Sequence, residues 1–151
     1  MRKSLDEFLS FLAVEKGSSA NTVAAYRNDL QQLADFIGTR PGTNGWHVLN
    51  RSAIQDFILD LKQRGYREST VARKVAAVRS FFAFLSAEGA IHTNPTEGLS
   101  SPRVGKTLPK AISPNEVDEL LEQPSRRNTP EAKRDRAMLE LLYATGMRVT
   151  E

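Results

Sequence analysis

The sequence predicts an all-α fold, in which a small four-helix bundle is followed by a linker and a shorter helical segment. Apolar residues recur at spacings of three and four over most of the 151 residues, as in amphipathic helices that bury one face. Glycines follow the periodic stretches, where a helix would end. No stretch makes a convincing strand, so we expect the helices to pack on one another.

The first two predicted helices are separated by a short glycine and serine segment. The first covers residues 4–16 and ends at Gly17, a residue type that readily takes the left-handed conformation after a helix. Ser18 and Ser19 are candidate N-caps for the second helix, which ends at Gly38. Its apolar positions are Val23, Tyr26, Leu30, Leu33 and Ile37.

The third and fourth predicted helices follow a loop at residues 39–50 that is rich in glycine and proline. The third begins near Ser52 and is closed by Gly65, and the fourth runs from about residue 68 to 88. The fourth helix carries the longest apolar stripe, made of Val71, Val75, Val78, Phe82 and Leu85. These four helices complete the predicted bundle.

A linker and a second helical segment are predicted after the bundle. Residues 92–112 contain several prolines and glycines and show no periodicity, which is typical of a connection between domains. Ser113 then stands as an N-cap with Glu116 at the capping-box position, so a helix should begin there. A last helix should begin at Pro130 and end at Gly146.

Composition excludes several functional classes. The hydrophobic content of 40% and charged content of 26% are typical of soluble globular proteins, and no apolar run approaches the roughly 20 residues of a membrane span. The N-terminus lacks the apolar region of a signal peptide, so we expect a cytoplasmic protein without a membrane partner. With no cysteine and only His47 and His92 as imidazoles, we expect neither a metal site nor a cofactor.

Basic residues concentrate in one part of the bundle. The net charge of +3 permits a polyanionic partner without demanding one. The stretch 62–79, however, has a single acid, Glu68, among six basic residues: Lys62, Arg64, Arg67, Arg73, Lys74 and Arg79. This distribution predicts a surface that faces phosphates.

A helical wheel of the fourth helix indicates which residues form that surface. Thr70, Arg73 and Ala77 lie opposite the valine stripe, with Ser69 on one flank and Lys74 on the other. Basic side chains among small ones suit close approach to a DNA groove, with contacts to phosphates and base edges. The alternative is an ordinary solvated helix face.

Further DNA-contacting candidates lie outside the fourth helix. Thr22 and Arg27 take comparable outward positions on the second helix, although Thr22 could equally be a structural residue of the helix start. Arg103 and Lys106 in the linker could contact the DNA backbone, or could only keep the linker solvated. We predict these four residues, together with those of the fourth helix, as the DNA-binding set.

The C-terminal residues 134–151, RDRAMLELLYATGMRVTE, resemble the motif that carries the first catalytic arginine of the Xer-like tyrosine recombinases of the phage integrase family. Earlier segments also resemble the core-binding domain and linker of that family, among them Thr22, Tyr26, Asp29 and Leu30, the start of the fourth helix, and Asn94-Pro95. The resemblance covers the whole chain. It implies a SAM-like core-binding domain at residues 1–92, a linker at 93–112 and the beginning of a catalytic domain at 113–151.

The family resemblance implies a cofactor-free chemistry on double-stranded DNA. In the family a tyrosine hydroxyl attacks a phosphodiester and forms a phosphotyrosine link, within a tetramer of recombinase subunits on DNA. The second and fourth bundle helices enter the major groove. Arg148 matches the first catalytic arginine, whose guanidinium stabilises charge on the phosphate oxygens. Its alternative is an ordinary surface arginine at a helix end.

The remaining catalytic residues of the family have no counterpart in the sequence. The His-x-x-Arg element is missing, and Tyr26, Tyr66 and Tyr143 do not match the nucleophile. Tyr26 and Tyr143 lie at helical spacing, which predicts core or half-buried positions. We therefore expect these 151 residues alone not to cleave DNA, either as a truncated gene or as a designed fragment. Two alternatives stay open: a noncatalytic DNA-binding protein, and a helical module whose basic face meets an acidic protein.

Overall fold

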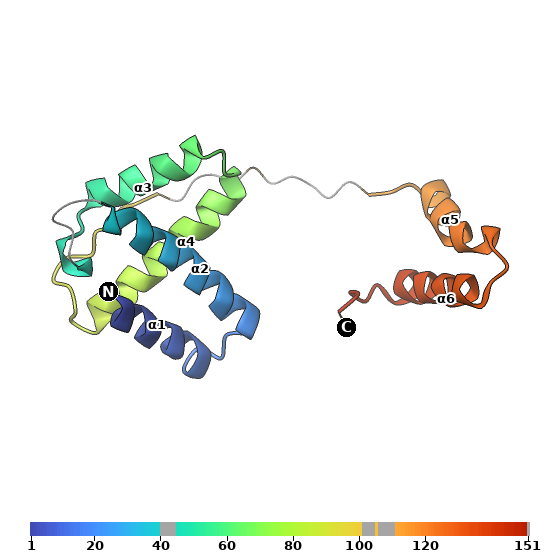
Figure 1. The fold of residues 1–151 in the computed structure, drawn as a ribbon, viewed down its shortest axis with the longest axis horizontal. Helices are drawn as coiled ribbons and strands as arrows, with labels where there is room; N and C mark the ends of the chain where they lie inside the picture. The colour runs from blue at the N-terminus through green and yellow to red at the C-terminus, as the bar shows by residue number, and fades with distance from the viewer. Residues whose placement is uncertain (40–44, 101–104, 106–110, 151) are drawn as a thin grey trace. The chain divides into compact units, whose positions relative to one another are not determined.

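The computed structural model describes residues 1–39, 45–100, 105 and 111–150, and they form two compact units, Met1–Gly105 and Lys106–Glu151 (Figure 1). The first unit contains the helices α1 (Arg2–Val14), α2 (Ala20–Gly38), α3 (Arg51–Gln63) and α4 (Glu68–Ala87), with a short 3₁₀ helix, η1 (Trp46–Val48). The second contains α5 (Pro114–Glu122), the 3₁₀ helix η2 (Gln123–Arg126) and α6 (Pro130–Thr145). No described residue lies in a strand, so the predicted all-α fold is confirmed.

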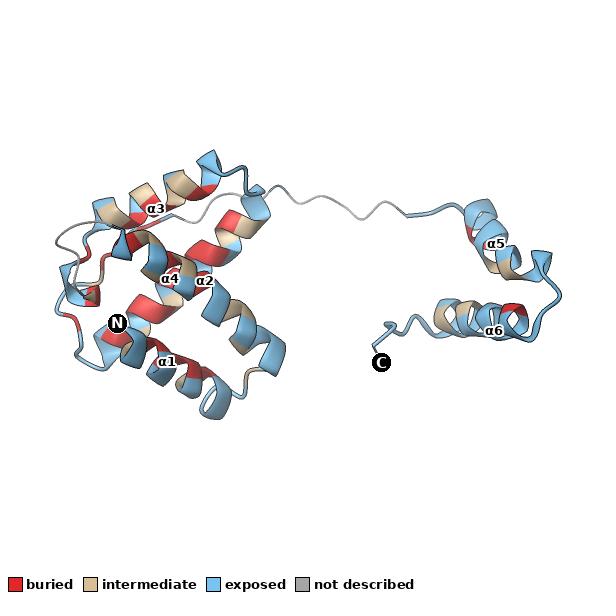
Figure 2. Ribbon diagram, viewed as in Figure 1, coloured by how far each residue is buried: buried red, intermediate tan, exposed pale blue. Residues whose placement is uncertain are grey.

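Helix α4 is the centre of the first unit. It packs against α1, α2 and α3, and Figure 1 shows α2 crossing it. The predicted stripe of α4 is buried and is extended by Phe81, as the inward-facing buried positions in Figure 2 show. The buried apolar residues of α4 are Val71, Val75, Ala77, Val78, Phe81, Phe82 and Leu85.

Aromatic rings from α1, η1 and α4 pack together in this core. The ring centroids of Phe8 and Phe81 are 5.3 Å apart, and those of Trp46 and Phe81 are 4.8 Å apart, both with edge-on geometry. The indole Nε1 of Trp46 donates a hydrogen bond of 3.0 Å to the carbonyl oxygen of Met1. Trp46 therefore anchors the start of α1 from a segment that the sequence predicts only as a loop.

The chain continues to pack on the bundle after α4. Ile91 and Leu99 are buried in the same core, and Arg51 Nη2 donates a 3.2 Å hydrogen bond to the carbonyl oxygen of Gly98. Part of the linker predicted from residue 93 is therefore built into the first unit. The functional division at residue 92 stays a prediction.

The helix starts follow the expected capping chemistry. The Ser19 hydroxyl accepts a hydrogen bond from the Thr22 amide at 3.2 Å, as predicted for α2. Helix α3 begins one residue earlier than predicted, because the side chain of Asn50 caps it through the amide of Ala53. Ser113 and Glu116 form the predicted capping box at the start of α5.

The second unit is thin, and two of its apolar residues, Val117 and Ala132, are buried among those described. Helices α5 and α6 contact each other, and both are otherwise largely exposed in Figure 2. Tyr143, which the sequence predicts as core or half-buried, is 64% exposed. That prediction is wrong, because the contacts of α6 with α5 and η2 within the described part of this unit leave the Tyr143 side chain uncovered. Other exposed apolar side chains of the unit include Leu120, Met138, Leu141, Met147 and Val149.

Candidate nucleic-acid interface

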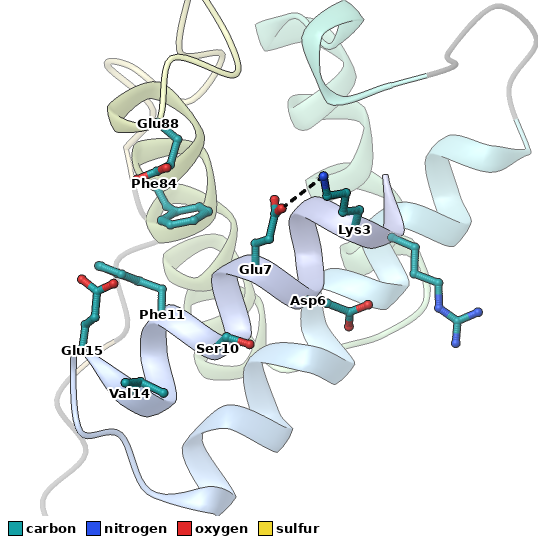
Figure 3. Close-up of a pocket in the computed structure, with 10 residues that line it drawn as sticks. Lys3, Asp6, Glu7, Ser10, Phe11, Val14, Glu15, Phe84 and Glu88 are labelled. Carbon is teal, nitrogen blue, oxygen red and sulfur yellow. Dashed lines mark ion pairs between the residues drawn. The ribbon is translucent and has the colours of Figure 1, made fainter.

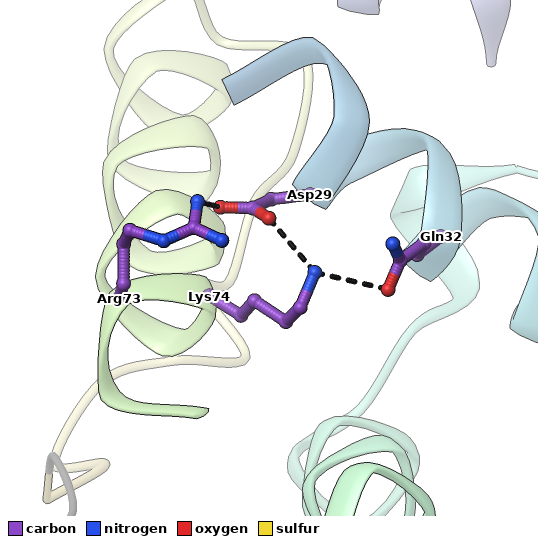
Figure 4. A network of polar contacts seen from close by, with 4 residues as sticks. All are labelled: Asp29, Gln32, Arg73 and Lys74. Atoms are coloured by element: carbon purple, nitrogen blue, oxygen red, sulfur yellow. Dashed lines mark hydrogen bonds and ion pairs between the residues drawn. The ribbon is translucent and has the colours of Figure 1, made fainter. Parts of the chain in front are cut away.

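A cluster of four polar side chains joins α2 to α4 (Figure 4). Asp29 and Gln32 come from α2, and Arg73 and Lys74 come from α4. Lys74 Nζ donates to Asp29 Oδ1 at 2.8 Å and to Gln32 Oε1 at 2.9 Å, while Arg73 Nη1 donates to Asp29 Oδ2. We call these four residues the junction cluster.

Two charges of the junction cluster are buried, and they neutralise each other. Asp29 is 1% exposed and Lys74 is 2% exposed, so neither charge is solvated by water. Burial of an unpaired charge is very costly, and the direct ion pair with additional hydrogen bonds offsets that cost. Lys74 Nζ also lies 5.4 Å from the centroid of the Tyr66 ring, a favourable cation–π position. The Asp29–Lys74 pair therefore holds α2 and α4 together.

Arg73 carries the charge that the junction cluster shows to solvent. Its side chain is 50% exposed, although one guanidinium nitrogen is bonded to the buried carboxylate. A guanidinium has five N–H donors in a planar fork, so a group held on one side can still donate to a phosphate on the other. One anion and two cations thus leave the cluster with one positive charge, located at the surface.

Lys74, predicted on a flank of the exposed face of the fourth helix, is buried, so that prediction is wrong. Lys74 follows Val71 by three residues and precedes Val78 by four, so it lies on the side of the helix that packs inward. Ala77, also predicted outward, is buried at 2% exposure. With its ammonium group bonded to Asp29 and Gln32, Lys74 contributes to the interior and not to a groove-facing surface.

The other predicted residues of α4 are accessible. Ser69 is exposed in the first turn of the helix, and Thr70 behind it is half-buried. The N-cap residue Arg67 gives this turn no side-chain hydrogen bond, and Glu68 is the acid of the turn. Backbone amides at a helix start favour anions, so this turn is compatible with a phosphate beside Arg73.

The predicted residues of α2 lie at a different place on that helix. Arg27 is exposed and pairs with Asp6 of α1, with 3.5 Å between Nη1 and Oδ1. Asp29 faces α4, so Arg27 is directed to the α1 side and is not brought next to Arg73. Thr22 is exposed, and its hydroxyl lies 2.9 Å from that of Ser19 at the helix start. Thr22 therefore has the structural role at the helix start, and its role in DNA binding stays a prediction.

Arg103 and Lys106, the predicted contacts of the linker, lie outside the described residues. In the second unit, Arg148 is exposed and follows Gly146, which ends α6 with a left-handed φ of 64°. The Gly146 amide donates to the carbonyl oxygen of Leu142 at 2.9 Å. The predicted end of the helix before Arg148 is thus confirmed, while the catalytic role of Arg148 stays a prediction.

Acidic side chains mark a different face of the bundle. A hollow of about 800 Å³ is lined by side chains of α1 together with Phe84 and Glu88 of α4, and Figure 3 shows these side chains. Four carboxylates (Asp6, Glu7, Glu15 and Glu88) and two cations (Arg2 and Lys3) line the hollow, which leaves an excess of negative charge. This excess disfavours a phosphate there. The charge pattern therefore favours the N-terminal half of α4 for a polyanion.

Over residues 1–39, 45–100, 105 and 111–150, no group of three or more His, Cys, Asp or Glu side chains is placed to hold a metal ion. Within the same ranges, the helices are too short or too polar to cross a membrane.

Comparison with known proteins decides the family. The sequence profile described as "Phage integrase, N-terminal SAM-like domain" matches residues 5–89, more than half of the chain. The chain belongs to the phage integrase family. The match covers all four bundle helices, so the predicted SAM-like bundle and the predicted family are both confirmed.

Curated relatives in the phage integrase family are tyrosine recombinases. The chain is 53% identical over all 151 residues to "Tyrosine recombinase XerC" of Roseiflexus sp. (strain RS-1), and covers 48% of that protein. It is 40% identical over its full length to "Tyrosine recombinase XerD" of Listeria innocua serovar 6a, and covers 50% of it. The chain thus spans about half the length of the curated relatives it matches.

A solved structure of the family shares the fold. The "Integrase from mycobacterium phage Brujita" matches with a TM-score of 0.59 and 18% identity, over 79% of this chain and 38% of the integrase. At this identity the match supports the fold alone.

Sequence reasoning missed the role of Asp29 and Gln32 in this site. In the sequence, Asp29 stands out only as part of the family pattern. The available signal was an acid among apolar positions, since Asp29 follows Tyr26 by three residues and precedes Leu33 by four. An acid on the buried stripe of a helix requires a buried partner, and Lys74 is that partner here.

Proposed function

We propose that this chain is the DNA-binding part of a Xer-type tyrosine recombinase, with the first residues of its catalytic domain. The exposed face of α2 and the N-terminal half of α4 bind duplex DNA in the cytoplasm, within an assembly of recombinase subunits. The observation that supports this best is the junction cluster, which neutralises two buried charges and leaves the guanidinium of Arg73 at the surface.

Arg73 then binds a phosphate, and the amides and hydroxyls at the start of α4 contribute further contacts. Phosphate contacts of this kind fix the register of a protein on DNA, while Ser69 and Thr70 are short enough to reach base edges when the helix enters the major groove. Arg27 reaches the backbone from the α1 side of α2, with Asp6 as its partner before DNA arrives.

Arg148 supplies part of the catalytic chemistry. Strand cleavage by a tyrosine places negative charge on the nonbridging phosphate oxygens, and a planar guanidinium stabilises that charge with two parallel hydrogen bonds. No cofactor enters this reaction. Of the tyrosines, Tyr26 packs against the bundle core, Tyr66 lies beside Lys74, and Tyr143 lies on α6. We propose that none of them is the nucleophile, so that these 151 residues bind DNA without cleaving it.

The experiment that tests this function compares duplexes carrying a Xer-type half-site and a scrambled one at fixed salt. Variants Arg73→Ala and Ser69→Ala remove groups from the proposed surface, and Glu88→Gln in the acidic hollow is the control. We expect the half-site to be preferred by the unmodified chain, the two surface variants to bind more weakly, and the control to bind at least as well as the unmodified chain.

Two outcomes would contradict the proposal. Equal, weak binding of every variant to both duplexes would favour a helical module that binds an acidic protein. A covalent adduct between the chain and a nicked half-site would show that one of its own tyrosines is a nucleophile.

A further inference from the structure

We propose that Asp29 is a positioning residue for Arg73, holding its guanidinium in a DNA-binding orientation before DNA is present. This inference rests on the proposed DNA-binding function and concerns the same surface. It gives a buried acid a role in binding a polyanion, whereas its negative charge by itself would be expected to weaken that binding.

The geometry supports this role because the Asp29 carboxylate is buried and paired with Lys74, whereas the Arg73 side chain is half exposed. The Asp29 carboxylate is almost fully buried and is held by the bond from Lys74 Nζ to its Oδ1. Its Oδ2 accepts from Arg73 Nη1, so an immobile acceptor restrains one side of a half-exposed guanidinium. A long side chain that is ordered in advance loses less rotamer freedom when it binds a phosphate.

Lys74 makes the arrangement compatible with a bound phosphate. An unneutralised carboxylate beside Arg73 would cancel the attraction of its guanidinium for DNA. Lys74 supplies the cancelling positive charge from inside the protein, and it is held there by Gln32 and the Tyr66 ring. Asp29 therefore orients Arg73 without subtracting its charge from the surface.

A positioning role of Asp29 and a purely electrostatic role predict opposite changes in DNA affinity when Asp29 is removed. If Asp29 acts only through its charge, its removal should strengthen DNA binding, because a negative charge leaves the surface region. If Asp29 positions Arg73, its removal should weaken binding. The single variant Asp29→Asn would leave Lys74 buried without its carboxylate and could unfold the chain. The test therefore uses Asp29→Asn combined with Lys74→Met, which leaves the net charge unchanged.

The experiment is a double-mutant cycle on the full 151-residue chain with a duplex carrying a Xer-type half-site. Dissociation constants are measured for the unmodified chain, Arg73→Ala, the Asp29→Asn/Lys74→Met pair, and the triple variant. We expect losses of about tenfold for Arg73→Ala and about threefold to fivefold for the pair, in the range of single phosphate contacts. The triple variant should bind no more weakly than Arg73→Ala.

Two controls separate positioning from a loss of stability. Lys3→Gln/Glu7→Gln removes an exposed ion pair of α1, also without changing the net charge, and should leave binding unchanged. In the chain without DNA, NMR relaxation of the Arg73 Nε–H group should show an ordered guanidinium in the unmodified protein and a mobile one in the Asp29→Asn/Lys74→Met pair. A merely structural role of Asp29 would not change that signal selectively.

Each outcome decides the matter. Unchanged or tighter binding by the Asp29→Asn/Lys74→Met pair, or losses that multiply in the triple variant, would overturn the positioning role. A mobile Arg73 in the unmodified chain would do the same. A chain with an ordered Arg73 and no DNA binding would instead overturn the proposed function, since the positioning would exist without its ligand.

Discussion

Lys74 Nζ lies 2.8 Å from Asp29 Oδ1, and both side chains are almost completely buried where α2 meets α4. The two residues are 45 positions apart in the sequence, with Asp29 on α2 and Lys74 on α4. The pair fixes how the two helices that we propose to contact DNA lie against each other.

Removal of Lys74 alone should destabilise the bundle. In Lys74→Met, Asp29 keeps only the half-exposed Arg73 as a partner for its buried charge, and we expect a loss of about 3 kcal/mol in the free energy of unfolding. Urea denaturation followed by circular dichroism measures it. The Asp29→Asn/Lys74→Met pair should recover a large part of that loss, because no unpaired buried charge remains. If the pair were as unstable as the sum of its two single variants, the ion pair would not be the cause.

Trp46 is a core residue, although the sequence predicts a loop at its position. Trp46→Phe keeps an aromatic ring against Phe81 but loses the hydrogen bond to the Met1 carbonyl, at a cost of about 1 kcal/mol. Trp46→Ala should cost about 3–5 kcal/mol through the lost packing. Thermal unfolding checks both, with Val14→Ala as the control, since Val14 is 82% exposed and its loss should have little effect.

The capping box of α5 should titrate below the ordinary range of a glutamate. The backbone amide of Ser113, followed by its hydroxyl, donates to the Glu116 carboxylate and lowers its pKa below the usual 4.5. Because the folded pKa is depressed, the contribution to stability is present above the unfolded pKa and is lost as pH falls through the folded one. NMR titration of the Glu116 carboxyl carbon should show a lower midpoint than in Ser113→Ala. Equal midpoints would show that the Ser113 hydroxyl does not contribute to the lowered pKa, because Ser113→Ala keeps the backbone amide.

The exposed apolar face of α6 should promote self-association. Met138 and Leu141 are more than half exposed on α6, which contacts α5 and η2 within the described part of its unit. We expect sedimentation velocity to show concentration-dependent dimers or larger species, and Met138→Gln/Leu141→Gln to shift the population to monomer. A strictly monomeric chain at high concentration would show that this face does not associate.

Much of the fold could be predicted from the sequence because its helices are regular. The valine and phenylalanine stripe of α4 has one period, and the Ser19 and Ser113 caps follow local rules, so both are confirmed. Trp46 and Leu99 could not be assigned to the core in this way, because they lie in nonperiodic segments whose burial depends on tertiary contacts.

The candidate site could be predicted only in part, for a related reason. Arg73 is exposed, as the sequence predicts. For Lys74 the sequence also predicts a position at the surface, because a lysine is usually solvated, but the side chain is buried. Its burial becomes favourable only through Asp29, 45 residues earlier in the chain. Such a pairing is a property of the assembled bundle and has no local sequence signal.

The most direct test of the proposed interface is the salt dependence of DNA binding by the unmodified chain and by Arg73→Ala. Each neutralised phosphate releases counterions, so the logarithm of the affinity should fall linearly with the logarithm of the salt concentration. We expect Arg73→Ala to reduce the steepness of that line by about one unit, as for the loss of one phosphate contact. Parallel lines for the two proteins, or binding by neither, would contradict the assignment of Arg73 to the DNA-binding surface.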